Sequence, residues 1–122
     1  MKDFKKLEVW QKAFGLTLRI YETTSKFPKE ELFGLTSQVR RASSSINANI
    51  AEGCGREGNA DFARFLQMAM GSAVELENHL LLAHKLQILT DKDFQNLDNQ
   101  LTSVKKMLIS LIKKVRADIL AE

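Results

Sequence analysis

The sequence predicts an all-α protein, folded as an antiparallel up-down-up-down four-helix bundle, and three observations support this class. Apolar residues recur at helical spacing over four long segments. The 122 residues include one proline, and three of the six glycines lie between positions 53 and 58, so long helices are permitted almost everywhere else. Short loops separate the segments, and four amphipathic helices joined in this way pack most simply with alternating direction. Residues 1–122 have the length of a single domain with one packed core.

The first helix is expected over about residues 7–25. Its apolar positions, which begin at Leu7 and end at Tyr21, cover roughly 200° of the helix circumference. One packing partner needs a narrower face, so we expect burial against two neighbouring helices, or against one helix and another subunit. Trp10 lies on this wide face and is therefore a candidate residue of an oligomer interface.

The second helix is expected over about residues 29–53, and two starting points are open. Pro28 suits a first helical turn, and the two glutamates that follow favour the positive end of a helix. A start just after Gly34 is the alternative. The apolar seam is narrow and follows an alternating three-four spacing. It consists of Leu32, Leu35, Val39, Ala42, Ile46, Asn49 and Gly53.

The third and fourth helices are expected over about residues 59–87 and 91–119. Thr90, followed three residues later by Asp93, predicts an N-cap with an acidic first turn for the fourth helix. The seam of the third helix is Phe62, Phe65, Leu66, Ala69, Ala73, Leu76, Leu80 and Ala83. The seam of the fourth is Phe94, Leu97, Leu101, Val104, Leu108, Leu111, Val115 and Ile119.

Composition predicts a globular, cytoplasmic protein without a membrane segment. Hydrophobic residues make up 44% and charged residues 27%, and no apolar run approaches the roughly 20 residues of a membrane span. Cys54 is the single cysteine, and the first ten residues lack the apolar run of a signal peptide. The net charge of +3 permits nucleic-acid binding without requiring it.

Three motifs resemble parts of cofactor, metal or catalytic sites, but each is better explained without catalysis. Residues 53–58, GCGREG, match a dinucleotide-binding pattern, but no strand precedes them, so we interpret them as a turn between helices. Glu75 and His79 share a helix face, yet the fourth helix offers no facing carboxylate, and Cys54 has no base near it in the sequence. We therefore expect no catalytic, cofactor-binding or metal-binding residue. A metal- or thiol-dependent enzyme using these three side chains stays the weakest alternative.

Basic residues dominate the second half of the fourth helix. No acidic residue lies between Asp98 and Asp118. A solvated helix face explains such a run most simply, and a ridge that follows a phosphate backbone is the alternative. The basic residues are Lys105, Lys106, Lys113, Lys114 and Arg116.

Small and polar residues crowd the stretch QVRRASSSINANIAEG, residues 38–53. Neither Arg40 nor Arg41 has an acidic residue three or four positions away, so an ion partner must come from another helix, another subunit or a ligand. The serines leave a low surface that another backbone can approach, and Asn47 and Asn49 offer hydrogen bonds that fix register. These four residues are candidates for an oligomer interface, and simple exposure of the arginines to solvent is equally open.

Several segments resemble the four-helix-bundle protein family encoded within intervening sequences of bacterial large-subunit ribosomal RNA genes, which is sometimes labelled ribosomal. The chain is also similar to the accessory protein of diversity-generating retroelements. The resemblance runs from Leu7 to at least Leu89 and is carried by LEVWQKAF, IYETTSKFPKEELFGLTSQVRRAS, SINANIAEGCGR and FARFLQMAMGSAVELE. It implies a homo-oligomer, typically a pentameric ring, with a role in binding structured RNA or other nucleic acid and no catalysis. Five copies would carry 5 × 3 = +15 charges.

Two functions follow as hypotheses. The first is an oligomer that binds RNA or DNA through backbone contacts from Arg40, Arg41, Lys105, Lys106, Lys113 and Lys114. The second is a protein-interaction scaffold, for example for a reverse transcriptase, in which Arg40, Arg41, Asn47 and Asn49 contact other subunits or a partner protein.

Overall fold

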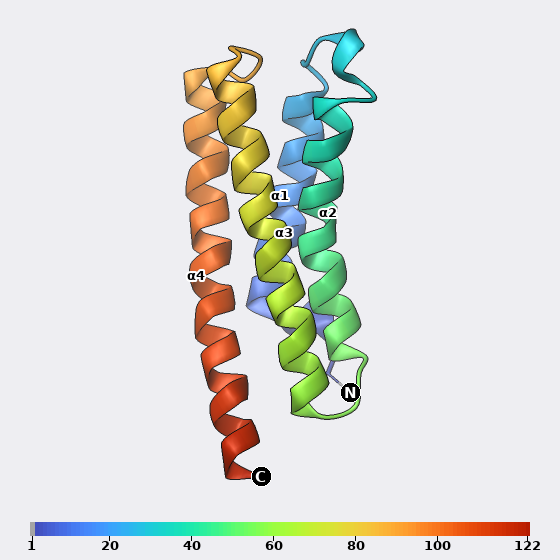
Figure 1. Ribbon diagram of the computed structural model, residues 1–122, viewed down its shortest axis with the longest axis vertical. Coiled ribbons are helices and arrows are strands. Elements are labelled where there is room, and N and C mark those ends of the chain that lie inside the picture. Colours follow the sequence, from blue (N-terminus) through green and yellow to red (C-terminus); the bar gives the residue numbers. More distant parts are fainter. Residues whose placement is uncertain (1) are drawn as a thin grey trace.

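The computed structural model describes residues 2–122 and confirms the predicted fold class. Within these residues the chain forms four long helices and no strand. The α1–α2 and α3–α4 connections lie at one end of the bundle, and the α2–α3 turn lies at the other end with both termini (Figure 1). The helices are α1 (Glu8–Thr24), α2 (Leu35–Cys54), α3 (Asn59–Lys85) and α4 (Asp91–Ala121), with short 3-10 helices η1 (Phe4–Lys6) and η2 (Lys29–Glu31).

Helix α2 begins at Leu35, which confirms the expected start just after Gly34, and the boundary near residue 29 is wrong. Residues 29–31 form the separate helix η2, and the backbone of Gly34 has φ −113° and ψ −112°, which is not helical. The Glu31 carboxylate accepts a hydrogen bond from the Leu35 amide at 3.2 Å. The Glu31 carboxylate thus caps a free amide at the positive end of α2, although Glu31 lies outside the helix.

The α3–α4 connection is two residues longer than expected. Helix α3 ends at Lys85 rather than near residue 87, because Gln87 adopts a left-handed conformation with φ +60°. The predicted N-cap of α4 is confirmed, since the Asp93 amide donates to the Thr90 hydroxyl at 3.1 Å.

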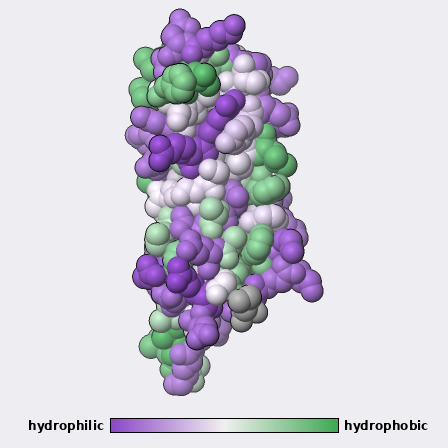
Figure 2. Space-filling model, turned by 90° about the vertical axis from the view of Figure 1, so that its right-hand side faces the viewer, coloured by the Kyte–Doolittle hydropathy of each residue, from purple (hydrophilic) through white to green (hydrophobic). Residues whose placement is uncertain are grey.

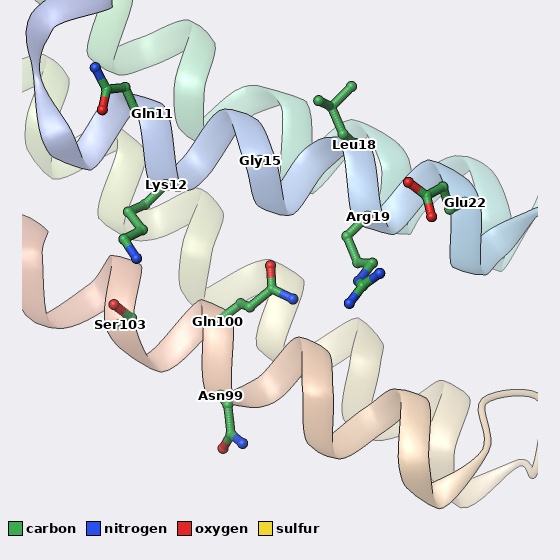
Figure 3. A pocket seen from close by; sticks show the side chains of 9 residues that line it. All are labelled: Gln11, Lys12, Gly15, Leu18, Arg19, Glu22, Asn99, Gln100 and Ser103. Carbon is green, nitrogen blue, oxygen red and sulfur yellow. The ribbon is translucent and has the colours of Figure 1, made fainter.

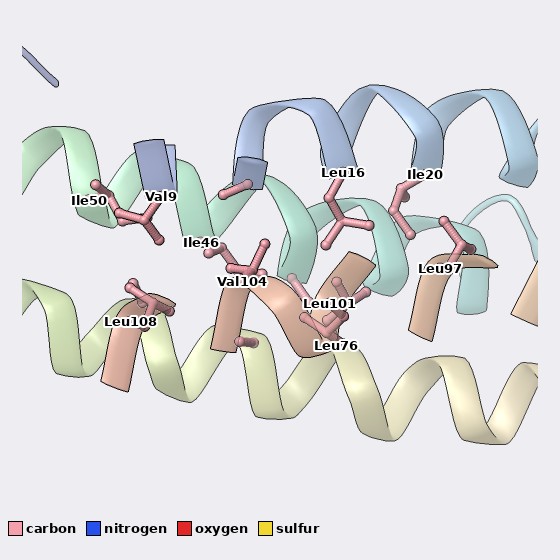
Figure 4. Close-up of a cluster of buried hydrophobic side chains, with 14 of the residues drawn as sticks. Val9, Leu16, Ile20, Ile46, Ile50, Leu76, Leu97, Leu101, Val104 and Leu108 are labelled. Carbon is pink, nitrogen blue, oxygen red and sulfur yellow. The ribbon is translucent and has the colours of Figure 1, made fainter. Parts of the chain in front are cut away.

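The core runs along the centre of the bundle, where buried aliphatic side chains from all four helices meet (Figure 4). All eight predicted seam residues of α3 are buried. Three seam predictions are wrong. Leu32 is 49% exposed because it precedes α2. In α2 the buried residue is Ile50 rather than Asn49, and in α4 it is Ile112 rather than Leu111. A straight helix drifts by about 20° per heptad, which moves the seam by one residue over a helix as long as α4.

Helices α2 and α3 approach each other most closely at Gly53. A Cβ atom added there would lie 2.9 Å from the Cβ atom of Phe65 and 3.1 Å from a ring carbon of Phe62. The neighbouring Cys54 is buried, and desolvation raises the pKa of its thiol. The Lys2 amide donates to the Cys54 carbonyl at 3.0 Å, which attaches the amino-terminal segment to the end of α2.

Part of the wide apolar face of α1 is exposed. Phe14, Leu18 and Tyr21 point outward, and Leu18 is 55% exposed. Figure 2 views the α2 side of the molecule, with apolar areas along the flank where α1 lies. Among residues 2–122, none of the helices combines the length and apolar character that crossing a membrane requires.

Candidate nucleic-acid interface

Four cations on the outward side of α4 form a surface that we call the α4 ridge: Lys106, Lys113, Lys114 and Arg116. All four side chains are exposed, and within the described residues none lies within ion-pair distance of a carboxylate. Lys105 differs from them, because its ammonium donates to the Glu77 carboxylate at 2.9 Å across the α3–α4 seam. Of the four lysines predicted to contact nucleic acid, three are thus exposed on α4, whereas Lys105 is half-buried and paired with Glu77.

The two arginines of α2 lie away from the α4 ridge. Helices α2 and α4 are diagonal in the bundle, and none of their Cα atoms lie within 8 Å of each other. The Arg40 side chain donates to the Thr24 hydroxyl at 2.9 Å, and its guanidinium lies 4.7 Å from the centre of the Tyr21 ring. Arg40 thus joins α2 to α1. Arg41 is exposed and has no ion pair within residues 2–122.

The polar residues that were expected to fix register between subunits make hydrogen bonds within one subunit. The Asn47 side-chain oxygen accepts from the Thr17 hydroxyl at 2.9 Å, and the Ser43 hydroxyl lies 2.9 Å from the same Thr17 oxygen. Asn49 donates to the Ser45 carbonyl at 2.9 Å. Buried polar groups require such partners, and the α1–α2 seam supplies them.

Trp10 is half-buried in a row of aromatic rings. Its ring centre lies 5.0 Å from that of Phe4 and 4.7 Å from that of Phe14. Phe14 in turn belongs to the exposed apolar surface of α1. Trp10 therefore supports the edge of that surface from within its own chain.

Sequence reasoning missed a groove along the α1–α4 seam, which we call the seam groove. Its central part is a hollow of about 660 Å³ between α1 and polar residues of α4 such as Gln100. On α1 it is lined by Gln11, Lys12, Gly15, Arg19 and the carboxylate Glu22, and by Leu18 of the exposed apolar surface. Figure 3 shows both cations pointing from α1 toward α4, with Gln100 between them. The seven-residue spacing of the cations was visible in the sequence, but which helix their face meets depends on the packing.

Two further hollows continue the seam groove toward both ends of the bundle. One, of about 350 Å³, reaches Lys26 and Lys92, and the other, of about 450 Å³, reaches Lys106 and Lys114 of the α4 ridge. Lys26 donates to Asp93 at 2.9 Å, and this hydrogen bond lowers the pKa of the Asp93 carboxyl. Together the three hollows are lined by six cationic residues and three carboxylates, which leaves a positive excess along the seam.

The histidines form two separate pairs with acidic residues. His79 lies 4.0 Å from Glu75, and its other ring nitrogen is buried without a hydrogen-bond partner. His84 lies 2.6 Å from Asp91 and stacks on a phenylalanine ring at the α3–α4 turn. Across residues 2–122, no group of three or more histidine, cysteine, aspartate or glutamate side chains gathers at metal-binding distance.

Comparisons with known proteins agree on a family. A solved structure described as a protein with unknown function from the S23 ribosomal protein family of Bacteroides thetaiotaomicron VPI-5482 superposes with a TM-score of 0.81 at 31% identity, covering 86% of this chain and 95% of that one. No curated protein sequence matches this chain. The profile of the 23S rRNA-intervening sequence protein family matches residues 5–110. The chain therefore belongs to the 23S rRNA-intervening sequence protein family.

Proposed function

We propose that this protein is a non-enzymatic homo-oligomer that binds RNA or another nucleic acid through phosphate contacts from the α4 ridge. The observation that carries the proposal is the contrast along α4: Lys105 has a carboxylate partner, whereas the four ridge cations have none within residues 2–122. Unpaired cations along the exposed side of one rigid helix can contact a phosphate backbone, and each contact adds affinity by releasing counterions. The family name, which refers to intervening sequences of ribosomal RNA, agrees with an RNA partner.

Self-association explains how a modest charge becomes sufficient. A chain with net charge +3 binds a phosphate backbone weakly, whereas five copies together would carry 5 × 3 = +15 charges. The exposed apolar surface of α1, with Phe14, Leu18 and Tyr21, is a suitable subunit interface, since contiguous apolar residues on a surface typically mark association sites. Arg40 fixes the Tyr21 ring at the edge of this surface.

The test measures binding of a fluorescently labelled RNA hairpin by anisotropy between about 50 and 200 mM salt. The ridge variant Lys106→Gln/Lys113→Gln is compared with the control Lys29→Gln/Lys85→Gln, which removes the same charge from exposed positions far from the ridge in the sequence. We expect the ridge variant to bind more weakly, with a salt slope reduced by about 0.9 for each lost contact to duplex phosphate. Equal losses in both variants, or no salt-sensitive binding of RNA or DNA by the wild type, contradict the proposal.

A second function, a protein-interaction scaffold, is favoured by the apolar surface of α1 and by the free guanidinium of Arg41. The partner under this hypothesis is another protein, such as a reverse transcriptase. Arg41→Glu separates the two functions when mass by light scattering and RNA binding are measured together. Loss of assembly with folded subunits favours the scaffold, whereas retained assembly with weakened RNA binding favours nucleic-acid binding.

A further inference from the structure

The seam groove differs in shape from the α4 ridge, and this difference limits what it can hold. It lies between two packed helices, whose axes are typically about 8–10 Å apart. Its central hollow of about 660 Å³ shares Arg19 and Glu22 with one end hollow, and the other end hollow lies further along the same pair of helices. A narrow trough of this kind admits one extended chain. A double helix, whose major groove alone is about 12 Å wide, touches only the rims.

The cations in the central hollow are available to a ligand. Lys12 and Arg19 point across the groove toward α4 (Figure 3), and neither has a carboxylate within ion-pair distance among residues 2–122. They are seven residues apart, which corresponds to roughly 10.5 Å along the helix axis. A strand with the phosphate spacing of a duplex, about 3.4 Å, would place phosphates three nucleotides apart on the two cations, and a more extended strand would place closer neighbours there.

The floor between the two cations is open. Gly15 lies midway between them, and a Cβ atom added there would meet nothing within 4 Å. The missing side chain lets a backbone pass along α1 without steric obstruction. The glycine therefore has a role in the groove that helix propensity would not select, since glycine weakens a helix by about 1 kcal/mol relative to alanine.

The opposite wall offers hydrogen bonds of the kind that unpaired bases use. The Gln100 side-chain nitrogen donates to Asn96 at 2.7 Å, which orients the amide and leaves its oxygen directed to the groove as an acceptor. Ser103 adds a hydroxyl. In a duplex the Watson–Crick edges are occupied, whereas a single strand presents them to such groups. No aromatic side chain lines the central hollow, so recognition there relies on charge and hydrogen bonds rather than on stacking.

We propose that the seam groove binds one unpaired strand of RNA or DNA, with its phosphates on Lys12 and Arg19 and its base edges toward Gln100. This inference rests on the proposed function and specifies its ligand as single-stranded. Lys106 and Lys114 of the α4 ridge also line an end hollow on the α1–α4 seam, so a strand that extends along this seam beyond the central hollow reaches the ridge.

The experiment compares labelled poly(U), labelled poly(dT) and a labelled RNA duplex of equal length by anisotropy at several salt concentrations. The groove variant Lys12→Gln/Arg19→Gln is measured beside the ridge variant Lys113→Gln/Arg116→Gln, which removes the same charge. We expect the wild type to prefer single strands. The groove variant should lose at least tenfold in affinity for single strands and little for the duplex, with a salt slope lower by about 1.4, or about 0.7 per contact.

A steric variant separates shape from charge. Gly15→Leu keeps the net charge and places a side chain over the open floor, and leucine favours the helix, so the fold is retained. We expect weaker binding of poly(U) with unchanged duplex binding. Circular dichroism during thermal unfolding verifies that every variant is folded.

Three outcomes overturn the inference and leave the proposed function intact. The first two are a duplex bound as tightly as single strands and groove variants that bind like the wild type. The third is displacement of poly(U) by polyglutamate of equal charge at equal concentration, which would indicate an acidic protein ligand for the groove. If no nucleic acid binds at any salt concentration, the proposed function itself fails. A preference for poly(U) over poly(dT) that persists against poly(dU) supports contact with the ribose hydroxyl, and equal affinity supports phosphate contacts alone.

Discussion

The α2–α3 seam and the α1–α4 seam show how one bundle divides structural and binding roles. At the first seam, the backbones come so close at Gly53 that no Cβ atom fits, and the interface is apolar. At the second, an added Cβ atom at Gly15 meets nothing, and the outer part of the interface carries cations and amides. Glycine therefore has opposite roles at the two seams. Gly53 allows two helices to pack closely, whereas Gly15 leaves space between two helices.

The largest expected effect on stability comes from a cavity in the core beside the closely packed α2–α3 seam. Ile46 is fully buried in α2 among side chains of the core. We expect Ile46→Ala to lower the free energy of unfolding by about 2–5 kcal/mol, because it removes buried methyl groups and leaves a cavity. Denaturant unfolding measures this change. The exposed Val74→Ala is the control and should change stability by about 0.5 kcal/mol or less. Similar losses at both positions would contradict the assigned core.

A smaller loss is expected from Gly53→Ala. The new methyl group would overlap Phe65 at 2.9 Å, so α2 and α3 must move apart, which costs about 1–3 kcal/mol. Gly71→Ala is the matched control in α3, since its surroundings are open. Thermal unfolding of the two variants should therefore shift in opposite directions, and a stabilised Gly53→Ala protein would show that the seam is looser than described.

Gly15→Ala tests whether α1 and α4 leave open space at this position. An exposed glycine inside a helix destabilises it, so alanine should raise the free energy of unfolding by about 0.5–1 kcal/mol. Denaturant unfolding again provides the measurement. Destabilisation by this substitution would mean that α1 and α4 pack together at this point in solution and that the groove is closed.

The smallest effect concerns the polar end of the open seam. Because the Lys26 hydrogen bond lowers the pKa of Asp93 from its ordinary value of 3.8, the pair stabilises the fold above pH 3.8, and this stabilisation disappears as the pH falls through the lowered value. Lys26 is well exposed, so solvent screening limits the contribution to less than about 1 kcal/mol. Unfolding of Asp93→Asn should differ from the wild type at neutral pH and converge with it in acid. A constant difference would assign the effect to something other than this ionisation.

The fold was accessible from the sequence because it depends on periodicity. All the seam residues predicted for α3 are buried, and the Thr90 cap forms as expected. The local exceptions are Leu32, where Gly34 delays the start of α2, and two shifts of the seam by one residue, from Asn49 to Ile50 and from Leu111 to Ile112. Each exception arises from backbone geometry that single-residue patterns do not encode.

The candidate site was accessible only in part, because binding surfaces depend on which helices are neighbours. The basic residues of α4 between Asp98 and Asp118 could be identified directly from the sequence, and most of them are exposed as the α4 ridge. The pairing of Lys105 with Glu77, and of Arg40 with Thr24, became visible only once α3 and α1 were placed. For the same reason the sequence did not indicate that Lys12 and Arg19 would face α4 across a groove.

Hydrogen–deuterium exchange of the full protein, measured with and without poly(U), tests the central claim most directly, that nucleic acid occupies the open seam and the adjoining α4 ridge. We predict slower exchange over residues 12–19 of α1 and 99–116 of α4, with no change along the outward side of α2 around Arg41. Protection confined to α2, with both walls of the seam groove unchanged, would contradict the account.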